Sequence, residues 1–176
     1  MPITVFFVGA PQIGKTEILN TLTQNKSADI GPTIGVEMRN WSHNSDGNVN
    51  QFHIWDISGK TFYANLMMTS IQGGQITVVC YDTRNASFFN NIKRWITIVE
   101  QSPYPQSLIL YGIIHDYEER QIMPSDALLI AEHVRHRRNC KSVHCIEGRI
   151  SDRCPLFECI TSVAKLHVRT YLNTQQ

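Results

Sequence analysis

Eight consecutive residues near the start of the chain have the types and spacing of a phosphate-binding loop. The segment reads Gly-Ala-Pro-Gln-Ile-Gly-Lys-Thr and fits the pattern G-x-x-x-x-G-K-[ST]. Glycines let backbone N–H groups approach phosphate oxygens without a Cβ clash, and the lysine supplies a cation for the β and γ oxygens. The threonine hydroxyl is a ligand for Mg²⁺. The predicted phosphate-binding residues are Gly9, Ala10, Pro11, Gln12, Ile13, Gly14, Lys15 and Thr16.

The elements around this loop are those that its chemistry requires. Residues 3–8 form a short apolar run typical of a buried parallel strand, and residues 15–23 have a helical pattern whose positive end faces the phosphates. Strands and helices then alternate, with one hairpin indicated by Asp46-Gly47. We therefore expect an α/β fold with a six-stranded, mostly parallel sheet, one antiparallel edge hairpin, and helices on both faces.

The spacing of apolar residues locates the other elements. A Ser125 cap after Pro124 is expected to open one of the helices. Strands are predicted over residues 3–8, 35–41, 51–55, 76–81, 107–111 and 142–146, and helices over residues 15–23, 88–100, 125–138 and 155–171. With no linker or repeat between them, they indicate a single domain over residues 1–176 with a core at about 3–171.

Composition excludes several classes of protein. Hydrophobic residues make up 42% and charged residues 18% of the 176 residues, which is typical of neither a disordered chain nor a membrane protein. A net charge of +1 gives no reason to expect a nucleic-acid partner, and we interpret the basic cluster at residues 135–141 as a helix C-terminus. Five scattered cysteines and no secretion signal favour reduced thiols in the cytoplasm.

Two further segments give the chain a family resemblance. Residues 31–37 (Gly-Pro-Thr-Ile-Gly-Val-Glu) are similar to the first switch of Rab GTPases, and residues 55–60 (Trp-Asp-Ile-Ser-Gly-Lys) resemble the second switch. The similarity continues through Tyr81-Asp82 and residues 89–95 at family spacing. The chain therefore resembles a small GTPase of the Ras superfamily, nearest to Rab, which implies the P-loop NTPase fold of the small-GTPase type.

The resemblance assigns roles to individual residues. It implies GTP/GDP and Mg²⁺ as cofactors, with Thr16, Thr33 and Asp56 as metal ligands. Thr33 and Gly59 would each offer an N–H to the γ-phosphate, so that the two switches relax when this phosphate leaves. Lys15 would stabilise the reacting phosphate. The expected partner surface consists of Ile34, Val36, Glu37 and Trp55, although ordinary core packing remains an alternative for Trp55.

Several positions depart from the family pattern. Lys60 stands where the family has the glutamine that orients the attacking water, which predicts impaired catalysis at this position. At the base-binding motif N-K-x-D only Asp116 is kept, with Ile113 and Ile114 before it. Glu147 and Gly148 replace the loop that reads guanine O6, and the Glu147 carboxylate would lie close to that oxygen. Weakened guanine selectivity is expected, since a site loses discrimination when its polar partners are removed.

Two functions of different classes follow from these residues. The first is a Rab-like GTP/GDP-binding molecular switch with weak intrinsic GTP hydrolysis, a GTPase-like phosphoanhydride hydrolase that acts through its switch regions on trafficking or signalling partners. These partners would be effector, exchange and activating proteins. The second is a pseudo-GTPase interaction module with absent, locked or non-selective nucleotide binding. A P-loop kinase or ATPase is a weaker third reading.

The last residues of the chain bear on its location. Residues 171–176 contain no terminal cysteine for prenylation. Either the chain is trimmed, or it does not anchor to membranes by itself, and we expect no intrinsic membrane anchor in this chain. The expectation is a cytoplasmic monomer that partners recruit to membranes.

Overall fold

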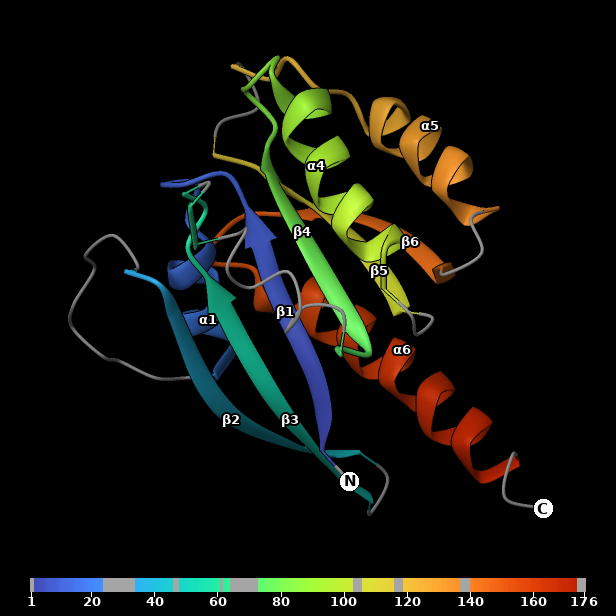
Figure 1. The fold of residues 1–176 in the computed structure, drawn as a ribbon. Helices are drawn as coiled ribbons and strands as arrows, with labels where there is room; N and C mark the ends of the chain where they lie inside the picture. The colour runs from blue at the N-terminus through green and yellow to red at the C-terminus, as the bar shows by residue number, and fades with distance from the viewer. Residues whose placement is uncertain are drawn as a thin grey trace.

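The strands form one sheet whose order places the strand before the predicted second switch beside the strand that leads into the phosphate-binding loop. The computed structural model describes residues 2–23, 34–45, 48–60, 62–63, 73–102, 106–115, 119–136 and 140–173. In this part of the chain six strands lie in the order β2-β3-β1-β4-β5-β6 (Figure 1). Only β2 and β3 pair antiparallel, and the other neighbours are parallel. The expected mostly parallel sheet with one antiparallel edge hairpin is confirmed.

The bounds of the elements follow the predicted alternation closely. The strands are β1 (Ile3–Gly9), β2 (Val36–Ser45), β3 (Asn48–Ile57), β4 (Ile76–Asp82), β5 (Gln106–Ile113) and β6 (Cys140–Gly148). The helices are α1 (Lys15–Thr23), α4 (Phe88–Glu100), α5 (Pro124–Arg135) and α6 (Arg153–Asn173). Of the helices described, none is both long and apolar enough to cross a lipid bilayer.

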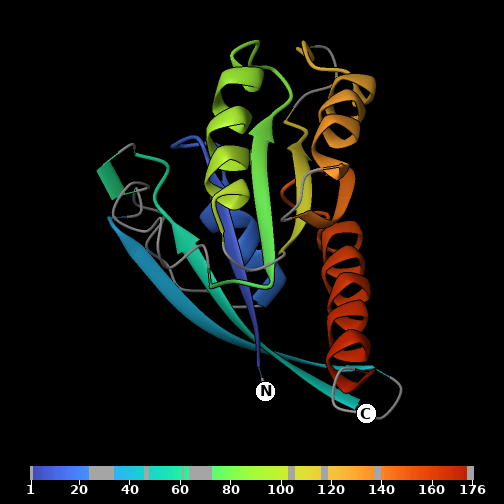
Figure 2. The same cartoon turned by 45° about the vertical axis from the view of Figure 1, so that its right-hand side comes forward.

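Helices cover both faces of the sheet, as Figures 1 and 2 show. One face packs against α4 and α5, through buried side chains such as Phe6, Tyr81 and Trp95. The opposite face packs against α1 and α6, through side chains such as Phe7, Leu19 and Ile160. Side chains of a strand alternate between the two faces, so neighbouring residues at a strand end contribute to different surfaces. This alternation decides which functional side chains can meet.

The start of α5 corrects one expectation. The helix begins at Pro124, and Met123 is its N-cap, so Ser125 lies inside the first turn rather than at the cap. The Met123 N–H donates to the Asp126 carboxylate at 2.8 Å, which satisfies a backbone donor that the helix leaves free. Proline is well suited to the first helical position because its missing N–H would have no intrahelical partner there. The helix ends at Arg135, before the predicted residue 138.

Aromatic side chains join the edge hairpin to the last helix. The ring of Trp41 on β2 stacks on Phe52 of β3 with the centroids 4.8 Å apart. Phe157 of α6 meets Trp41 edge-on at 5.0 Å and His43 at 4.4 Å. Such contacts add roughly 0.5–1.5 kcal/mol per pair beyond the area that they bury. The hairpin between the two predicted switches is therefore packed on α6.

Candidate functional site: the phosphate-binding loop and the strand ends around it

The loop between β1 and α1 has a backbone that its sequence explains. Gly9 and Gly14 have φ angles of 144° and 94°, which glycine adopts more readily than other residues. At Gly9 a Cβ would lie 2.3 Å from the backbone oxygen of Cys80, so no other residue fits this position without moving β4. The loop is thereby seated on the ends of β1 and β4, directly before the N-terminus of α1.

The side chain of Lys15 is folded into this loop. Its ammonium donates to the carbonyl oxygen of Ala10 at 2.7 Å and to that of Gly9 at 3.3 Å. The residue is only 6% exposed, and burial lowers the pKa of the ammonium, although the nearby Asp56 carboxylate opposes this shift. A buried cation held by carbonyl oxygens is positioned to bind an anion as soon as one enters the loop.

Asp56 and Thr16 form the part of the site that suits a divalent cation. The Thr16 hydroxyl donates to Asp56 Oδ2 at 2.5 Å. The other carboxylate oxygen, Oδ1, is buried and has no hydrogen-bond partner, and Asp56 as a whole is 0% exposed. A buried carboxylate oxygen without a partner lowers the stability of the fold unless a ligand supplies the missing contact. Hard oxygen donors of this kind fit Mg²⁺, so the residues present fit the expected ion.

Asparagine at position 56 is expected to stabilise the nucleotide-free protein. Burial raises the pKa of Asp56 above its value in the unfolded chain, more than the hydrogen bond from Thr16 lowers it. This raised pKa contributes stability at acid pH that is lost as pH rises through the folded-state value. In the presence of a chelator, the melting temperature of Asp56→Asn should therefore exceed that of the wild type by a margin that widens as pH rises above about 4, the usual value for an aspartate carboxyl group. A margin that is constant with pH would contradict the assignment.

Gly59, which follows β3, lies directly against the phosphate-binding loop. A Cβ at Gly59 would be 2.3 Å from the nitrogen of Pro11, 2.4 Å from the carbonyl carbon of Ala10 and 2.5 Å from the oxygen of Gly9. The next residue, Lys60, is exposed. The start of the predicted second switch and the phosphate-binding loop are thus in backbone contact.

The predicted base-binding positions that the structure describes are brought together, but with few polar groups. Ile113 is fully buried and Ile114 is 7% exposed. The Ile114 N–H donates to the Gly148 oxygen at 2.9 Å, which joins the ends of β5 and β6. The Glu147 carboxylate is held by Arg120 at 2.5 Å and by the Tyr81 hydroxyl at 3.4 Å.

These contacts bear on two expectations from the sequence. Glu147 is paired within the protein, on the face of the sheet that packs against α4 and α5, and its role in reading the base stays a prediction. Arg120 and Tyr81 were not predicted, because nothing in the linear sequence pairs them with Glu147. Thr33 and Asp116, expected at the metal and base sites, lie outside the described residues.

The predicted partner surface is divided between the two faces of the sheet. Trp55 packs on Phe6 with the ring centroids 6.2 Å apart and remains partly exposed beside the core. Met38 is its cross-strand neighbour and is 48% exposed, which sequence reasoning missed. Glu37 pairs across the strands with Asp56, and its carboxylate binds the buried Arg39. One part of the Trp55 side chain therefore packs on the core, and another part is exposed at the surface.

The apolar part of this surface is exposed at the start of the hairpin. Ile34 is 79% exposed, and Val36 is half-buried against the core on the side of α4.

The fold and the loop geometry define the P-loop fold of the small-GTPase type. Residues 4–142 match the family model described as the Ras family, and the chain belongs to that family. The resemblance to a Rab-like member of the Ras superfamily is confirmed by this match and by relatives that carry Ras-related names.

Three relatives illustrate the degree of similarity. Ras-related protein RIC2 of Oryza sativa subsp. japonica is 29% identical over 107 residues, which are 60% of this chain and 49% of that protein. Human Ras-related protein Rab-40B is 28% identical over 127 residues, 71% of this chain and 46% of the relative. Ras-related protein Rab-18 of Caenorhabditis briggsae is 25% identical over 138 residues, 77% and 67% of the two chains. The chain thus spans about half the length of the first two.

Proposed function

We propose that this chain is a Rab-like GTP/GDP-binding molecular switch with weak intrinsic GTP hydrolysis. The observation that carries the proposal is the buried, unpartnered Oδ1 of Asp56 next to Thr16 and Lys15, at the end of the strand that leads into Gly59. An anion bound to the Lys15 ammonium and a divalent cation bound to the Asp56 carboxylate would give each of these buried charges a partner. Mg²⁺-bound nucleoside di- and triphosphates are ligands of this kind.

Each residue of the loop has a defined part in this proposal. Thr16 and Asp56, with Thr33, would hold Mg²⁺, which when bound offsets the negative charge of the phosphates. Lys15 exchanges the carbonyl oxygens of Gly9 and Ala10 for phosphate oxygens, and so gains stronger charge-assisted hydrogen bonds. Gly59 is already against the loop, and its N–H would report whether a γ-phosphate is present.

Weak hydrolysis is proposed because of Lys60. An ammonium has three donors and no acceptor, so it cannot hold a water through paired donor and acceptor contacts. The side chain is exposed next to Gly59, and its charge can offset phosphate charge without orienting the nucleophile. An activating protein that supplies its own glutamine and arginine would overcome this defect.

Glutamine at position 60 is expected to raise single-turnover GTP hydrolysis by up to roughly 100-fold, which is the loss that a misplacement of about 1 Å can cause. The rate is measured as phosphate release from GTP-loaded protein. Lys93→Gln, a change of another exposed lysine, is the matched control and should leave the rate unchanged. An unchanged rate for Lys60→Gln would show that another residue limits GTP hydrolysis, and Pro11 would be the next candidate.

Partners would bind at the exposed apolar side chains next to the site. Ile34, Met38 and the partly exposed Trp55 belong to the segments that flank Gly59 and Asp56, so a change at the nucleotide would reach them directly. Effector, exchange and activating proteins of trafficking or signalling pathways are the proposed partners, and they would recruit a cytoplasmic monomer to membranes. No nucleic-acid partner is proposed.

A pseudo-GTPase interaction module is the second candidate. It is favoured by one observation, the apolar burial of Ile113 and Ile114 where the family has polar side chains. On this view the fold presents the surface around Ile34 and Trp55 without a nucleotide-dependent change, and the site is empty, locked or tolerant of different bases.

Titration calorimetry of nucleotide-stripped protein with GTP, GDP and ATP, with and without Mg²⁺, separates the two candidates. Mg²⁺-dependent binding that favours guanine is the expected result for a switch. No binding, or equal binding of GTP and ATP, would establish the interaction module instead. The same titration of Lys15→Ala shows how much of the measured binding heat comes from ligand bound at the phosphate-binding loop.

A further inference from the structure

A cluster of polar side chains joins α6 to the amino ends of β5 and β6, at the end of the sheet opposite to the phosphate-binding loop. Nε2 of His167 lies 2.9 Å from the Ser107 hydroxyl, and Nδ1 of the same ring lies 3.3 Å from the Lys141 ammonium. The Ser142 hydroxyl donates to the Ser107 oxygen at 2.8 Å, and Nε2 of His144 lies 3.2 Å from the Ser142 hydroxyl. Ser107 is buried, whereas Lys141 is exposed. The cluster therefore presents an amine at the surface with an imidazole behind it.

The contacts of His167 determine which of its ring nitrogens carries the hydrogen. An ammonium has donors only, so Nδ1 accepts from Lys141, and the hydrogen is on Nε2, which donates to Ser107. Burial, with a smaller contribution from the Lys141 ammonium, lowers the pKa of His167 to about 4, so the ring is uncharged at neutral pH. An uncharged imidazole whose Nδ1 has no hydrogen can take a proton from the amine beside it.

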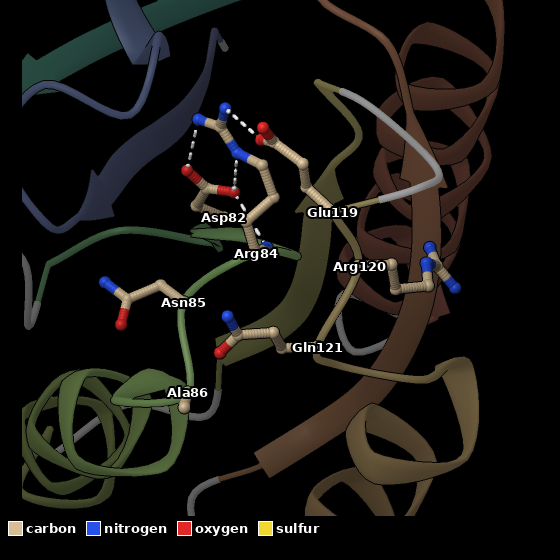
Figure 3. Close-up of a pocket in the computed structure, with 7 residues that line it drawn as sticks. All are labelled: Asp82, Arg84, Asn85, Ala86, Glu119, Arg120 and Gln121. Atoms are coloured by element: carbon tan, nitrogen blue, oxygen red, sulfur yellow. Dashed lines mark hydrogen bonds and ion pairs between the residues drawn. The ribbon is translucent and has the colours of Figure 1, made fainter.

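The surroundings of Lys141 favour the uncharged form of its amine. Within the part of the chain that the structure describes, no carboxylate forms an ion pair with Lys141. Arg84 shows the contrast, because its guanidinium is paired with both Asp82 and Glu119 (Figure 3). Partial burial lowers the pKa of Lys141. A larger share of this side chain is therefore uncharged at neutral pH than of a fully solvated lysine, and only the uncharged amine is a nucleophile.

We propose that Lys141 is a covalent modification site for acyl thioesters, with His167 as the base that takes the proton of the attacking amine. The Lys141 nitrogen forms a bond to the thioester carbonyl carbon, and the C–S bond breaks as the thiolate leaves. The proton that the nitrogen must lose passes to Nδ1 of His167 and from there to the thiolate. The products are an amide on Lys141 and a free thiol, and nothing is oxidised or reduced. The protonated adduct is a stronger acid than a free ammonium, so a weakly basic imidazole can accept its proton.

The modification would change the charge beside α6 without breaking the cluster. An amide N–H can still donate to Nδ1 of His167, so this contact survives acylation. The loss of one cation takes the formal net charge of the chain from +1 to zero. Because the cluster lies at the opposite end of the sheet from the phosphate-binding loop, the inference does not depend on the proposed nucleotide binding.

The test measures the initial rate of acetylation at individual lysines by peptide mass spectrometry, with acetyl coenzyme A as the acyl thioester. At pH 7 Lys141 should react about tenfold faster than Lys93, an exposed lysine of α4. His167→Gln removes the base and keeps a polar side chain, so it should lower the rate at Lys141 by about tenfold and leave Lys93 unchanged. His53→Gln changes a half-buried histidine of β3 and is the matched control, in which both rates should stay as in the wild type.

Equal rates at Lys141 and Lys93 in the wild type would overturn the proposal. An unchanged rate in His167→Gln, or the same loss in His53→Gln, would overturn the role of His167 as the base. Should His167→Gln not fold, the pH profile of the wild type decides in its place. The rate at Lys141 should then begin to rise at a lower pH than the rate at Lys93, and two superimposable profiles would contradict the proposal.

Discussion

Replacing Lys15 with alanine is expected to lower the affinity for both GTP and GDP by roughly 10- to 150-fold. The buried ammonium is held by two carbonyl oxygens in the absence of a ligand, and these are poorer partners than phosphate oxygens. A hydrogen bond to a charged group contributes about 1.5–3 kcal/mol, which corresponds to this range of dissociation constants. Because burial lowers the pKa of this ammonium, its removal should not destabilise the nucleotide-free fold. Calorimetry gives the affinities and thermal denaturation gives the stability.

The controls for Lys15 distinguish a local effect from a global one. Lys93→Ala removes an exposed lysine from α4 and should change neither quantity. Thr16→Asn places a larger side chain next to the buried Asp56 and should weaken Mg²⁺-dependent binding in particular. If neither Lys15→Ala nor Thr16→Asn alters nucleotide content or partner binding, the switch proposal is wrong and the pseudo-GTPase module takes its place.

Alanine at position 59 is the second substitution with a large expected effect. The added Cβ would lie 2.3–2.5 Å from backbone atoms of Gly9, Ala10 and Pro11. Backbone atoms cannot rotate away, so the phosphate-binding loop and the segment after β3 must separate, at a cost of about 1–3 kcal/mol. Because Gly59 is the proposed contact of the γ-phosphate, Gly59→Ala should weaken GTP binding more than GDP binding, by roughly 5- to 150-fold.

The ratio of GTP to GDP dissociation constants measures this effect. Gly73→Ala changes an exposed glycine and serves as the control for the loss of backbone freedom. Equal weakening of GTP and GDP would show that the contact between Gly59 and the loop supports the whole site rather than the γ-phosphate.

The sequence was sufficient for the order of the elements because each has a strong local signal. The buried apolar strands and the glycines of the phosphate-binding loop depend on neighbouring residues, so β1, α1 and β4 lie where the pattern predicts them. Element ends were less accurate. The first strand of the hairpin extends to Ser45, and the second begins at Asn48. Helix α5 starts at Pro124, one residue before the predicted cap Ser125, because proline is well suited to the first helical position.

The site was predictable only where its residues are close in sequence or carry a motif. Lys15, Thr16 and Asp56 lie together, since parallel strand ends meet at one edge of a sheet, and their role at a metal and phosphate site stays a prediction. Arg120 and Glu147 are 27 residues apart, and their contact depends on the register of three strands and on the absence of a side chain at Gly112. Register is a property of the assembled sheet, so no inspection of the linear sequence reveals it.

The three tryptophans of this chain lie in three different surroundings. Trp95 is 3% exposed in the core, Trp55 is partly exposed directly before Asp56, and Trp41 is stacked between the hairpin and α6. Indole emission depends on the polarity around the ring, and here one ring is shielded while another adjoins the proposed metal ligand. The protein therefore contains its own optical reporter, in which movement at the end of β3 shifts the fluorescence of Trp55 against a constant signal from Trp95.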